Sequence, residues 1–439
     1  MVVTIVVLLI LAGVTISLLL DENGIIKKSK DARREYGTSK TNEQEQMDNA
    51  GDWIDEAVTG KKSNVVKSFK EAKTENSTID GKKEGNANNP TIPAGYIPIN
   101  TETSNWGNGK DAPSQDSVKH GLVIKDEKDN EWVWVPVPDV TVMCNTSNTA
   151  EYTLCGTTGE TAVKTKLYSK TMTIGTDSNK TTMSRTTPGT STSDSYREPD
   201  LVVGGDGTSY DAKEEYYKTI LGDTGTKEQL AQLFVDEYKA MIESVSKYGG
   251  FYIGRYELSG TVTEPTEKPG KTLTNTDWYN LYNACRSSKL QASDKVKTQM
   301  IWGCQWDVTM NWLISSGAKT SDEVNKDSST WGNYKNYNTA NNYTEGTAGY
   351  EKNAGSLQNT GSSENWKANN IYDLAGNVWE WTQEAGYTNF RAGRGGSYDY
   401  NGSSYPASAR NNYRPGSSGI DDLRFSSHFN NKVILDTRA

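Results

Sequence analysis

Residues 370–382 of this 439-residue chain read NIYDLAGNVWEWT, and residues 394–398 read RGGSY. Side chains alternate between the two faces of an extended strand, so Trp379 and Trp381 share one face while Val378 and Glu380 take the other. Large aromatic side chains on one face are most often core residues. Gly376 permits a tight turn just before them. We therefore expect a turn followed by a strand whose tryptophans pack inward.

Other segments of the same β-rich and aromatic character accompany this stretch in a fixed order: residues 132–137 (WVWVPV), residues 250–257 (GFYIGRYE), a helix starting near Asp277-Trp278-Tyr279, and the closing pair Ala409-Arg410. Together with D-x-x-G-N-V-W-E-W and R-G-G-S-Y, they resemble the formylglycine-generating enzymes and their sulfatase-modifying relatives. The resemblance runs from about residue 92 to residue 429. It implies an α+β domain of the C-type-lectin fold with long loops.

The same resemblance implies a calcium site. In the family, carboxylate and backbone oxygens of this motif hold Ca²⁺, a hard cation suited to such ligands. The matching positions here are Asp373, Gly376, Val378 and Glu380, with Asp where relatives often have Asn. The alternative is that Glu380 caps backbone groups or pairs with an arginine such as Arg394.

The resemblance does not extend to catalysis. Oxidation in this family uses two cysteines after the R-G-G-S segment, which bind copper as soft thiolate ligands. Residues 398–425 contain no cysteine. Related oxidases need a histidine-rich iron site, and this chain has only His120 and His428, far apart in sequence. We expect a non-catalytic member, with an oxidase whose catalytic groups have moved as the rival.

Residues 398–425 instead have the composition of a recognition surface, rich in Tyr, Asn, Ser, Gly, Asp and Arg. Tyrosine offers rigid contact area, while Asn and Ser offer adaptable hydrogen bonds. The alternative is a polar loop without a particular ligand. In diversity-generating-retroelement relatives of this family the same position carries the diversified residues. We expect ligand binding by Tyr398, Asp399, Tyr400, Asn401, Tyr405, Asn411, Asn412, Tyr413, Arg414, Asp421 and Asp422.

The N-terminus has a different character. Residues 2–20, VVTIVVLLILAGVTISLLL, are uncharged and would span roughly 28 Å as a helix, close to a hydrocarbon core of about 30 Å. With the charged segment that follows, this resembles the long N-terminal helix of a type IV pilin, which implies membrane anchorage and filament packing. The prepilin-peptidase site is absent, which leaves assembly open. Basic residues after the run favour a cytoplasmic C-terminal side, but we expect export.

Composition excludes several function classes. The formal net charge is −9 and no basic stripe accompanies the aromatic residues, so we expect no nucleic-acid partner. The four cysteines show no C-x-x-C spacing, which argues against a structural zinc site. A disulfide between Cys144 and Cys155 stays open. Two histidines cannot form a multi-histidine metal site.

The domain boundaries follow from composition. We expect a pilin-like helix at residues 1–58, a polar linker at 59–91, and the lectin-fold domain at 92–436 with a low-complexity insertion at about 144–225.

Local patterns predict a hairpin over residues 121–137 and three helices. The first helix has its inward face at residues 230–245 and a capping box at Thr226 and Gln229. The second follows Thr274 and Asp277 and has Trp278, Leu281, Tyr282 and Cys285 on one face. The third carries Trp306 and ends before Gly317.

The sequence therefore predicts a cell-surface or pilus-associated ligand-binding protein whose partner is a surface protein or a glycan. The alternatives are an enzyme of the formylglycine-generating type and a structural pilin-like subunit without a specific ligand.

Overall fold

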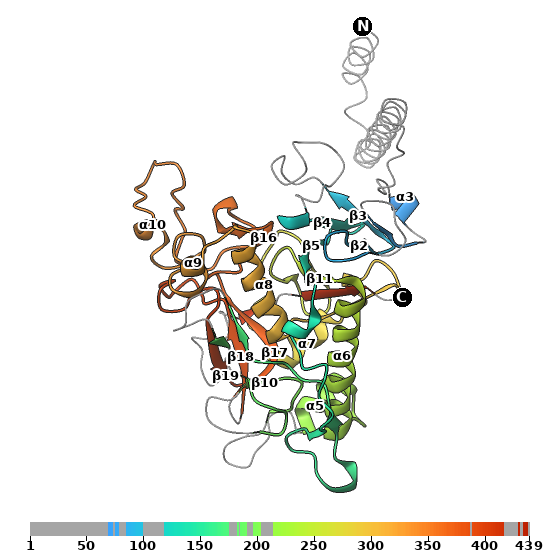
Figure 1. Ribbon diagram of the computed structural model, residues 1–439. Coiled ribbons are helices and arrows are strands. Elements are labelled where there is room, and N and C mark those ends of the chain that lie inside the picture. The colour runs from blue at the N-terminus through green and yellow to red at the C-terminus, as the bar shows by residue number, and fades with distance from the viewer. Residues whose placement is uncertain are drawn as a thin grey trace, which may run out of the picture. The chain divides into compact units, whose positions relative to one another are not determined.

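The structure is a computed structural model that describes residues 69–72, 75–78, 85–99, 118–174, 182–183, 185–190, 196–202, 214–386, 389–416, 429–430 and 433–437. All of them belong to one compact unit, Asn64–Ala439. Figure 1 shows helices and two main sheets in this unit, so the expected α+β class is confirmed.

The larger sheet has six strands, and every neighbouring pair is antiparallel. Its order is β14 (Val296–Met300), β21 (Val433–Thr437), β11 (Gly250–Gly254), β5 (Glu131–Pro136), β4 (Val123–Asp126) and β3 (Tyr96–Ile99). Helix α6 (Lys227–Tyr248) packs against β11 and β21. The C-terminal strand β21 thus lies between two strands that are distant from it in sequence.

The smaller sheet holds the motif that opened the sequence analysis. Its order is β10 (Tyr196–Arg197), β17 (Trp379–Gly386), β18 (Phe390–Arg394) and β19 (Arg410–Tyr413), and β20 (Phe429–Asn430) pairs with β17 in parallel. Helix α8 (Gly303–Ser315) contacts both β5 and β17. It therefore links the two sheets (Figure 1).

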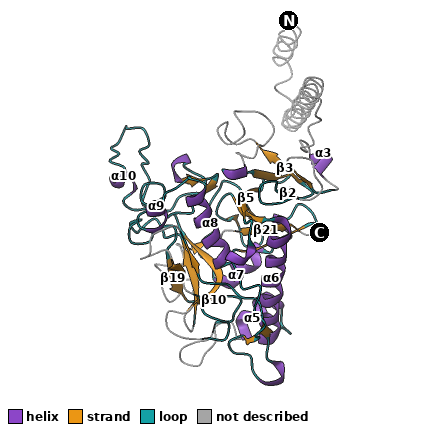
Figure 2. Cartoon of the chain, viewed as in Figure 1, coloured by secondary structure: helices purple, strands orange, loops and turns teal. Residues whose placement is uncertain are grey.

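Short elements and long loops complete the described chain, as the teal segments of Figure 2 show. The helices are α3 (Phe69–Ala72), α5 (Glu214–Leu221), α7 (Trp278–Cys285), α9 (Ser321–Asn325), α10 (Tyr337–Ala340) and the 3-10 turns η2 (Val140–Val142), η3 (Gly159–Thr161), η4 (Ser288–Leu290) and η5 (Glu364–Trp366). Two-stranded pairs are formed by β1 (Ser77–Thr78) with β2 (Thr91–Ile92), β6 (Tyr152–Thr153) with β7 (Lys164–Thr165), β8 (Met172–Thr173) with β9 (Thr182–Met183), β12 (Ser259–Gly260) with β13 (Pro265–Thr266), and β15 (Lys367–Ala368) with β16 (Ile371–Tyr372).

The capping box predicted at Thr226 and Gln229 and the hairpin are confirmed. Thr226 Oγ1 accepts a hydrogen bond from the Gln229 backbone N at 3.2 Å, and the Gln229 side chain accepts one from the Thr226 backbone N at 2.9 Å. This reciprocal capping satisfies two backbone donors that the helix leaves unpaired. The turn between β4 and β5 is closed by Asp126 Oδ1, which accepts from the backbone N atoms of Lys128 and Asn130.

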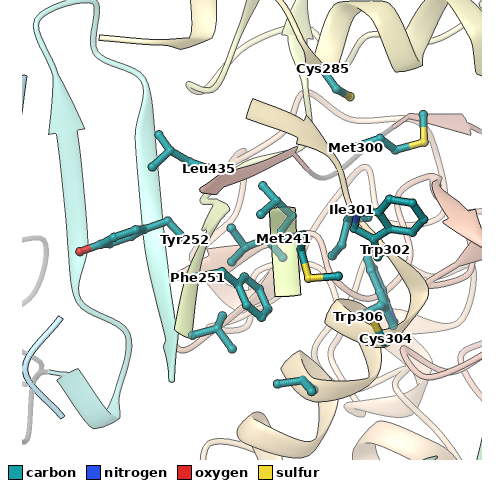
Figure 3. Packing of buried hydrophobic residues seen from close by; sticks show 14 of the residues in the cluster. Met241, Phe251, Tyr252, Cys285, Met300, Ile301, Trp302, Cys304, Trp306 and Leu435 are labelled. Atoms are coloured by element: carbon teal, nitrogen blue, oxygen red, sulfur yellow. The ribbon is translucent and has the colours of Figure 1, made fainter. Parts of the chain in front are cut away.

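The core forms where α6, β11 and α8 meet. Figure 3 shows Met241, Phe251 and Trp306 turned toward this interior, whereas Tyr252 points to the other side of its sheet. The Tyr252 hydroxyl donates to the Thr91 carbonyl at 2.9 Å. Successive side chains of β11 therefore point into two buried layers, as expected for a strand covered on both faces.

All four cysteines are buried free thiols, so the Cys144–Cys155 bridge that the sequence left open is not formed. Cys144 Sγ donates to the Val140 carbonyl at 3.8 Å, and the Cys155 backbone N donates to Asp200 at 2.7 Å. Burial raises the pKa of Cys144 to about 11 and that of Cys155 to about 12, which keeps both protonated. Cys285 lies in the core side of α7, as its helical spacing indicated.

The structure differs from the expected boundaries at two places. Part of the expected polar linker is folded onto the domain, since Ala72 is buried and Ala87 accepts a hydrogen bond from Trp134 Nε1 at 3.1 Å. The expected low-complexity insertion contributes Arg185 and Glu198 to the interior. Composition alone predicts neither feature, because the residues that contact these two segments lie far from them in sequence.

The expected pilin-like helix at residues 1–58 lies outside the described residues. Within the described ranges, no helix is both long and apolar enough to cross a membrane.

Candidate ligand-binding face

The loop that joins β18 to β19, residues 395–409, begins with two glycines in the left-handed backbone region. Gly395 has φ +87° and Gly396 has φ +82°, conformations that side chains disfavour. A Cβ atom at Gly395 would collide with Glu380 Oε2, and one at Gly396 would meet the Tyr405 carbonyl at 2.5 Å. The Gly-Gly pair of the R-G-G-S motif therefore sets the direction in which this loop, called here the β18–β19 loop, leaves the sheet.

Residues outside the β18–β19 loop hold its backbone. The buried Tyr334 hydroxyl oxygen lies 2.7 Å from the Gly395 carbonyl and 2.9 Å from the Tyr405 carbonyl, so the two carbonyls share its one hydrogen. Trp306 Nε1 donates to the Ala407 carbonyl at 3.0 Å, and Ser329 Oγ accepts from the Gly402 backbone N at 3.0 Å. These bonds reach main-chain atoms of the loop, and Gly395 and Gly402 leave no room for a Cβ atom at two of the bonded residues.

Arg394 fixes the far end of the loop. Its Nε donates to the Ala409 carbonyl at 3.0 Å and a terminal nitrogen donates to the Ser408 carbonyl at 3.2 Å. The same guanidinium pairs with Asp307 Oδ1 on α8 at 2.7 Å. The loop is thereby connected to the helix between the sheets.

Three half-buried tyrosines of the loop and of β19 gather over Trp379. We call Tyr400, Tyr405 and Tyr413 the tyrosine cluster. Their ring centroids lie 6.4, 5.0 and 5.7 Å from that of the fully buried Trp379. Tyr400 and Tyr405 meet edge to face at 4.8 Å. Such arrangements are favourable for aromatic pairs, so a core tryptophan supports an accessible aromatic surface.

Polar groups frame the tyrosine cluster. Asn411 Nδ2 donates to the Tyr413 hydroxyl at 2.8 Å, and Ser397 Oγ donates to the exposed Asp399 carboxylate at 2.7 Å. Burial raises the pKa of Tyr413, and the neighbouring Tyr400 and Tyr405 hydroxyls and the Asp399 carboxylate raise it further. The tyrosine therefore remains neutral at physiological pH.

Strand alternation divides the remaining predicted ligand residues. Asn411 and Tyr413 point toward the tryptophan side, whereas Arg410 and Asn412 point to the opposite face, where both contact Tyr196. Asn412 is thus placed away from the tyrosine cluster. Tyr398 is half-buried, Asn401 and Arg414 are exposed, and Asp421 and Asp422 lie outside the described residues.

Beneath this face lies a buried group of ion pairs that the sequence analysis did not find. We call it the six-charge cluster; its members are Arg185, Glu198, Asp307, Glu384, Arg394 and Arg410. Arg185 contacts Asp307 Oδ2 at 2.6 Å and Glu384 Oε1 at 2.9 Å. Three arginines face three carboxylates, so the formal charges of the cluster balance.

The pKa values reflect this balance. Burial alone would raise the pKa of Asp307, but the guanidinium groups of Arg185, Arg394 and Arg410 hold it at about 2. Burial raises the pKa of Glu198, against the pull of Arg185. Asp307 is therefore the carboxylate on which the positive charges of the cluster converge.

The positions proposed for calcium lie close to the same loop. Gly376 has φ +71° and donates its backbone N to the Gly395 carbonyl at 2.9 Å, so the expected tight turn is present. Asp373 and Glu380 are buried carboxylates, and Val378 is fully buried. Asp373 Oδ2 accepts from Thr360 Oγ1 and the Gly361 backbone N, both at 2.9 Å.

The sequence analysis suggested Arg394 as an alternative partner of Glu380. In the structure Arg394 forms ion pairs with Asp307 and Glu384. In the described part of the chain no three His, Cys, Asp or Glu side chains are grouped closely enough to hold a metal by themselves. A calcium ion here would need carbonyl oxygens as well.

Comparisons with known proteins return few matches. No family model matches the chain, and no curated protein matches it. Among solved structures, it is similar to Treponema denticola variable protein 1, with 15% sequence identity and a TM-score of 0.25. That alignment covers 44% of this chain and 85% of the variable protein.

Proposed function

We propose that this chain is a non-catalytic ligand-binding protein of the cell surface or a pilus, whose globular unit is a C-type-lectin-type domain of the formylglycine-generating-enzyme branch. The observation that carries the proposal is the β18–β19 loop. Its main chain is held by Tyr334, Trp306 and Arg394, while the tyrosine cluster stands half-buried above Trp379.

A tethered main chain that carries half-buried tyrosines suits ligand recognition. Tyrosines are among the side chains that most often supply interface energy, and a fixed backbone avoids the entropy cost of ordering a loop on binding. The exposed Asp399 and Asn401 add hydrogen-bonding groups at the rim of the same surface. A ligand would therefore meet aromatic faces framed by adaptable polar groups.

The same geometry is compatible with diversification by a retroelement, because main-chain tethers tolerate exchange of exposed side chains. In this proposal the exposed positions of residues 398–414 vary while the glycines and Arg394 stay. A near-copy of the coding segment for residues 394–425, differing at adenines and lying beside a reverse-transcriptase gene, would support this part.

Surface anchorage and calcium complete the proposal. The uncharged run of residues 2–20 supports insertion in a membrane. Calcium is supported by the donor set of Asp373 and Glu380, two buried carboxylates, together with the carbonyls of Gly376 and Val378. The Glu380 carboxylate and the Leu374 carbonyl both approach Gly395, so the turn and the strand converge there.

The test uses the full chain in a neutral detergent. A glycan and protein array identifies a ligand, and then Tyr400→Ala, Tyr405→Ala and Tyr413→Ala are compared for affinity and melting temperature. Losing an anchor costs about 2 kcal/mol, or roughly 30-fold in Kd. Tyr350→Ala, at a half-buried tyrosine outside the face, is the matched control and should bind as the parent does. Unchanged affinity in all three cluster variants would refute this placement.

A further inference from the structure

Residues 168–171 and 185–190 line an open hollow of about 600 Å³. Six of the eight described residues that line it carry a hydroxyl group, and the other two are Lys170 and Arg185. No acidic residue belongs to this described lining, although the chain has 56 acidic and 47 basic residues. We call this space the threonine hollow. Its composition favours a ligand with negative charge and several hydrogen-bonding groups.

Hydrogen bonds join the two walls of the threonine hollow. Thr171 Oγ1 accepts from the Arg185 backbone N at 3.0 Å, and Arg185 Nη1 donates to the Lys170 carbonyl at 3.2 Å. The Arg185 guanidinium is neutralised by Asp307 and Glu384 of the six-charge cluster. Arg185 therefore fixes the shape of the hollow, whereas the exposed Lys170 supplies its positive charge.

Three side chains of the hollow have hydrogens that no described residue accepts. The Tyr168 hydroxyl accepts from Asn145 Nδ2 at 3.1 Å, which leaves its own hydrogen to donate. Thr186 Oγ1 is buried and has no hydrogen-bond partner among the described residues. Lys170 Nζ donates to the Thr141 carbonyl, and an ammonium group has further hydrogens. Burying an unpaired hydroxyl costs free energy, which a ligand oxygen would recover.

We propose that the threonine hollow binds a sugar that carries a sulfate or phosphate ester. The ester group lies at Lys170 and Thr186, because charge-assisted hydrogen bonds to an oxyanion are the strong ones. The sugar ring occupies the rest of the hollow, where hydroxyl side chains both donate to and accept from its hydroxyl groups. This site contains no residue of the tyrosine cluster and goes beyond the function proposed for that face.

One acidic residue lies near the positive charge of the hollow. Asp139 Oδ1 accepts from the Thr141 backbone N at 2.9 Å, and Lys170 Nζ donates to the carbonyl of the same residue. The Asp139 carboxylate therefore weakens the attraction of Lys170 for an anion. Asp139→Asn keeps a side chain that can cap the turn and should leave the affinity for an ester unchanged or increase it.

Ligand-detected NMR titrations of the full chain, in neutral detergent at low salt, test the proposal. The probes are glucose 6-sulfate, N-acetylglucosamine 6-sulfate and glucose 6-phosphate. The ligand controls are the two unmodified sugars, inorganic sulfate and inorganic phosphate. At least one ester should bind about tenfold more tightly than both its parent sugar and its free oxyanion, because it makes both sets of contacts.

Variants assign the binding to the threonine hollow. Lys170→Gln should raise the Kd of the preferred ester about fivefold, and Thr186→Val, which loses a hydrogen bond to a charged group, about tenfold. Lys164→Gln removes the same charge from an exposed position on β7 and is the matched control, with an unchanged Kd. The melting temperatures of the three variants verify that they are folded.

The outcomes decide each part of the proposal. Equal effects of Lys170→Gln and Lys164→Gln, or no ester that binds more tightly than its parent sugar, would overturn it. Inorganic sulfate or phosphate that binds as tightly as the esters would show a site for a free oxyanion only and would overturn the sugar assignment. Tyr405→Ala should leave the Kd of the ester unchanged, so this test and that of the proposed function can fail independently.

Discussion

Asp307→Asn is the substitution that tests the six-charge cluster most directly. Asp307 is fully buried on α8, and its two carboxylate oxygens lie 2.6 Å from Arg185 and 2.7 Å from Arg394. Asparagine has nearly the same shape but no charge. The variant therefore leaves three arginines facing two carboxylates in a place that water does not reach.

Two independent arguments give the size of the effect. Removing one partner of a buried ion pair costs about 3–5 kcal/mol, because the remaining charge stays desolvated. A carboxylate whose pKa is about 2 in the folded chain, against about 3.9 when unfolded, contributes on the order of 2–3 kcal/mol. The two ranges meet near 3 kcal/mol. For a unit of this size we expect the melting temperature to fall by roughly 4 °C.

The pH dependence has a defined sign. Because the folded pKa of Asp307 is lowered, its contribution is complete above the unfolded pKa near 4 and is lost as the pH falls toward 2. Asp307→Asn lacks this contribution at every pH, so its stability should converge with that of the parent chain in strong acid.

Calorimetry and urea unfolding of the full chain in neutral detergent, at pH 7 and between pH 5 and 2, measure both effects. Asp399→Asn, at an exposed aspartate, is the matched control. The reasoning is refuted if Asp307→Asn costs no more than this control at pH 7. It is also refuted if the difference between variant and parent does not shrink in acid.

Three further predictions test other parts of the molecule. A chain reduced to Asn64–Ala439 should remain folded and soluble, because the described core lies within that unit; light scattering and circular dichroism check this, and a molten product would count against it. Calcium should raise the melting temperature of the parent chain by mass action but not that of Asp373→Asn combined with Glu380→Gln; an equal shift in both would move the ion elsewhere. Gly395→Ala should lower the melting temperature by several degrees, since its φ of +87° and the Glu380 carboxylate both oppose a Cβ.

Local signals in the sequence predicted local structure well. Thr226 and Gln229 cap α6 as their spacing indicated, and Asp277 caps α7 by accepting from the Asn280 backbone N at 2.8 Å. These interactions join residues three positions apart, so a short window of sequence contains both partners. The alternation around Trp379 predicted its burial for the same reason.

The six-charge cluster could not be predicted in this way. Arg185 comes from a Thr/Ser-rich tract, whereas Asp307 lies on a helix more than a hundred residues later and Glu384 on a strand later still. Each residue alone has the appearance of a solvated surface charge, the usual position of such residues. Only the fold reveals that they compensate one another.

Arg394 joins the buried charges to the proposed binding face. Its guanidinium touches Asp307 on one side and the carbonyls of Ser408 and Ala409 on the other, so the buried charges also hold the end of the β18–β19 loop. Substitutions at Asp307 should therefore disturb binding only by loosening the loop, together with a loss of melting temperature. Substitutions at Tyr400 leave the main-chain tethers from Tyr334, Trp306 and Arg394 in place and should change affinity more than melting temperature. When affinity is plotted against melting temperature, variants at Asp307 and variants at Tyr400 should fall on different lines. A single common line would show that the loop side chains themselves support the fold.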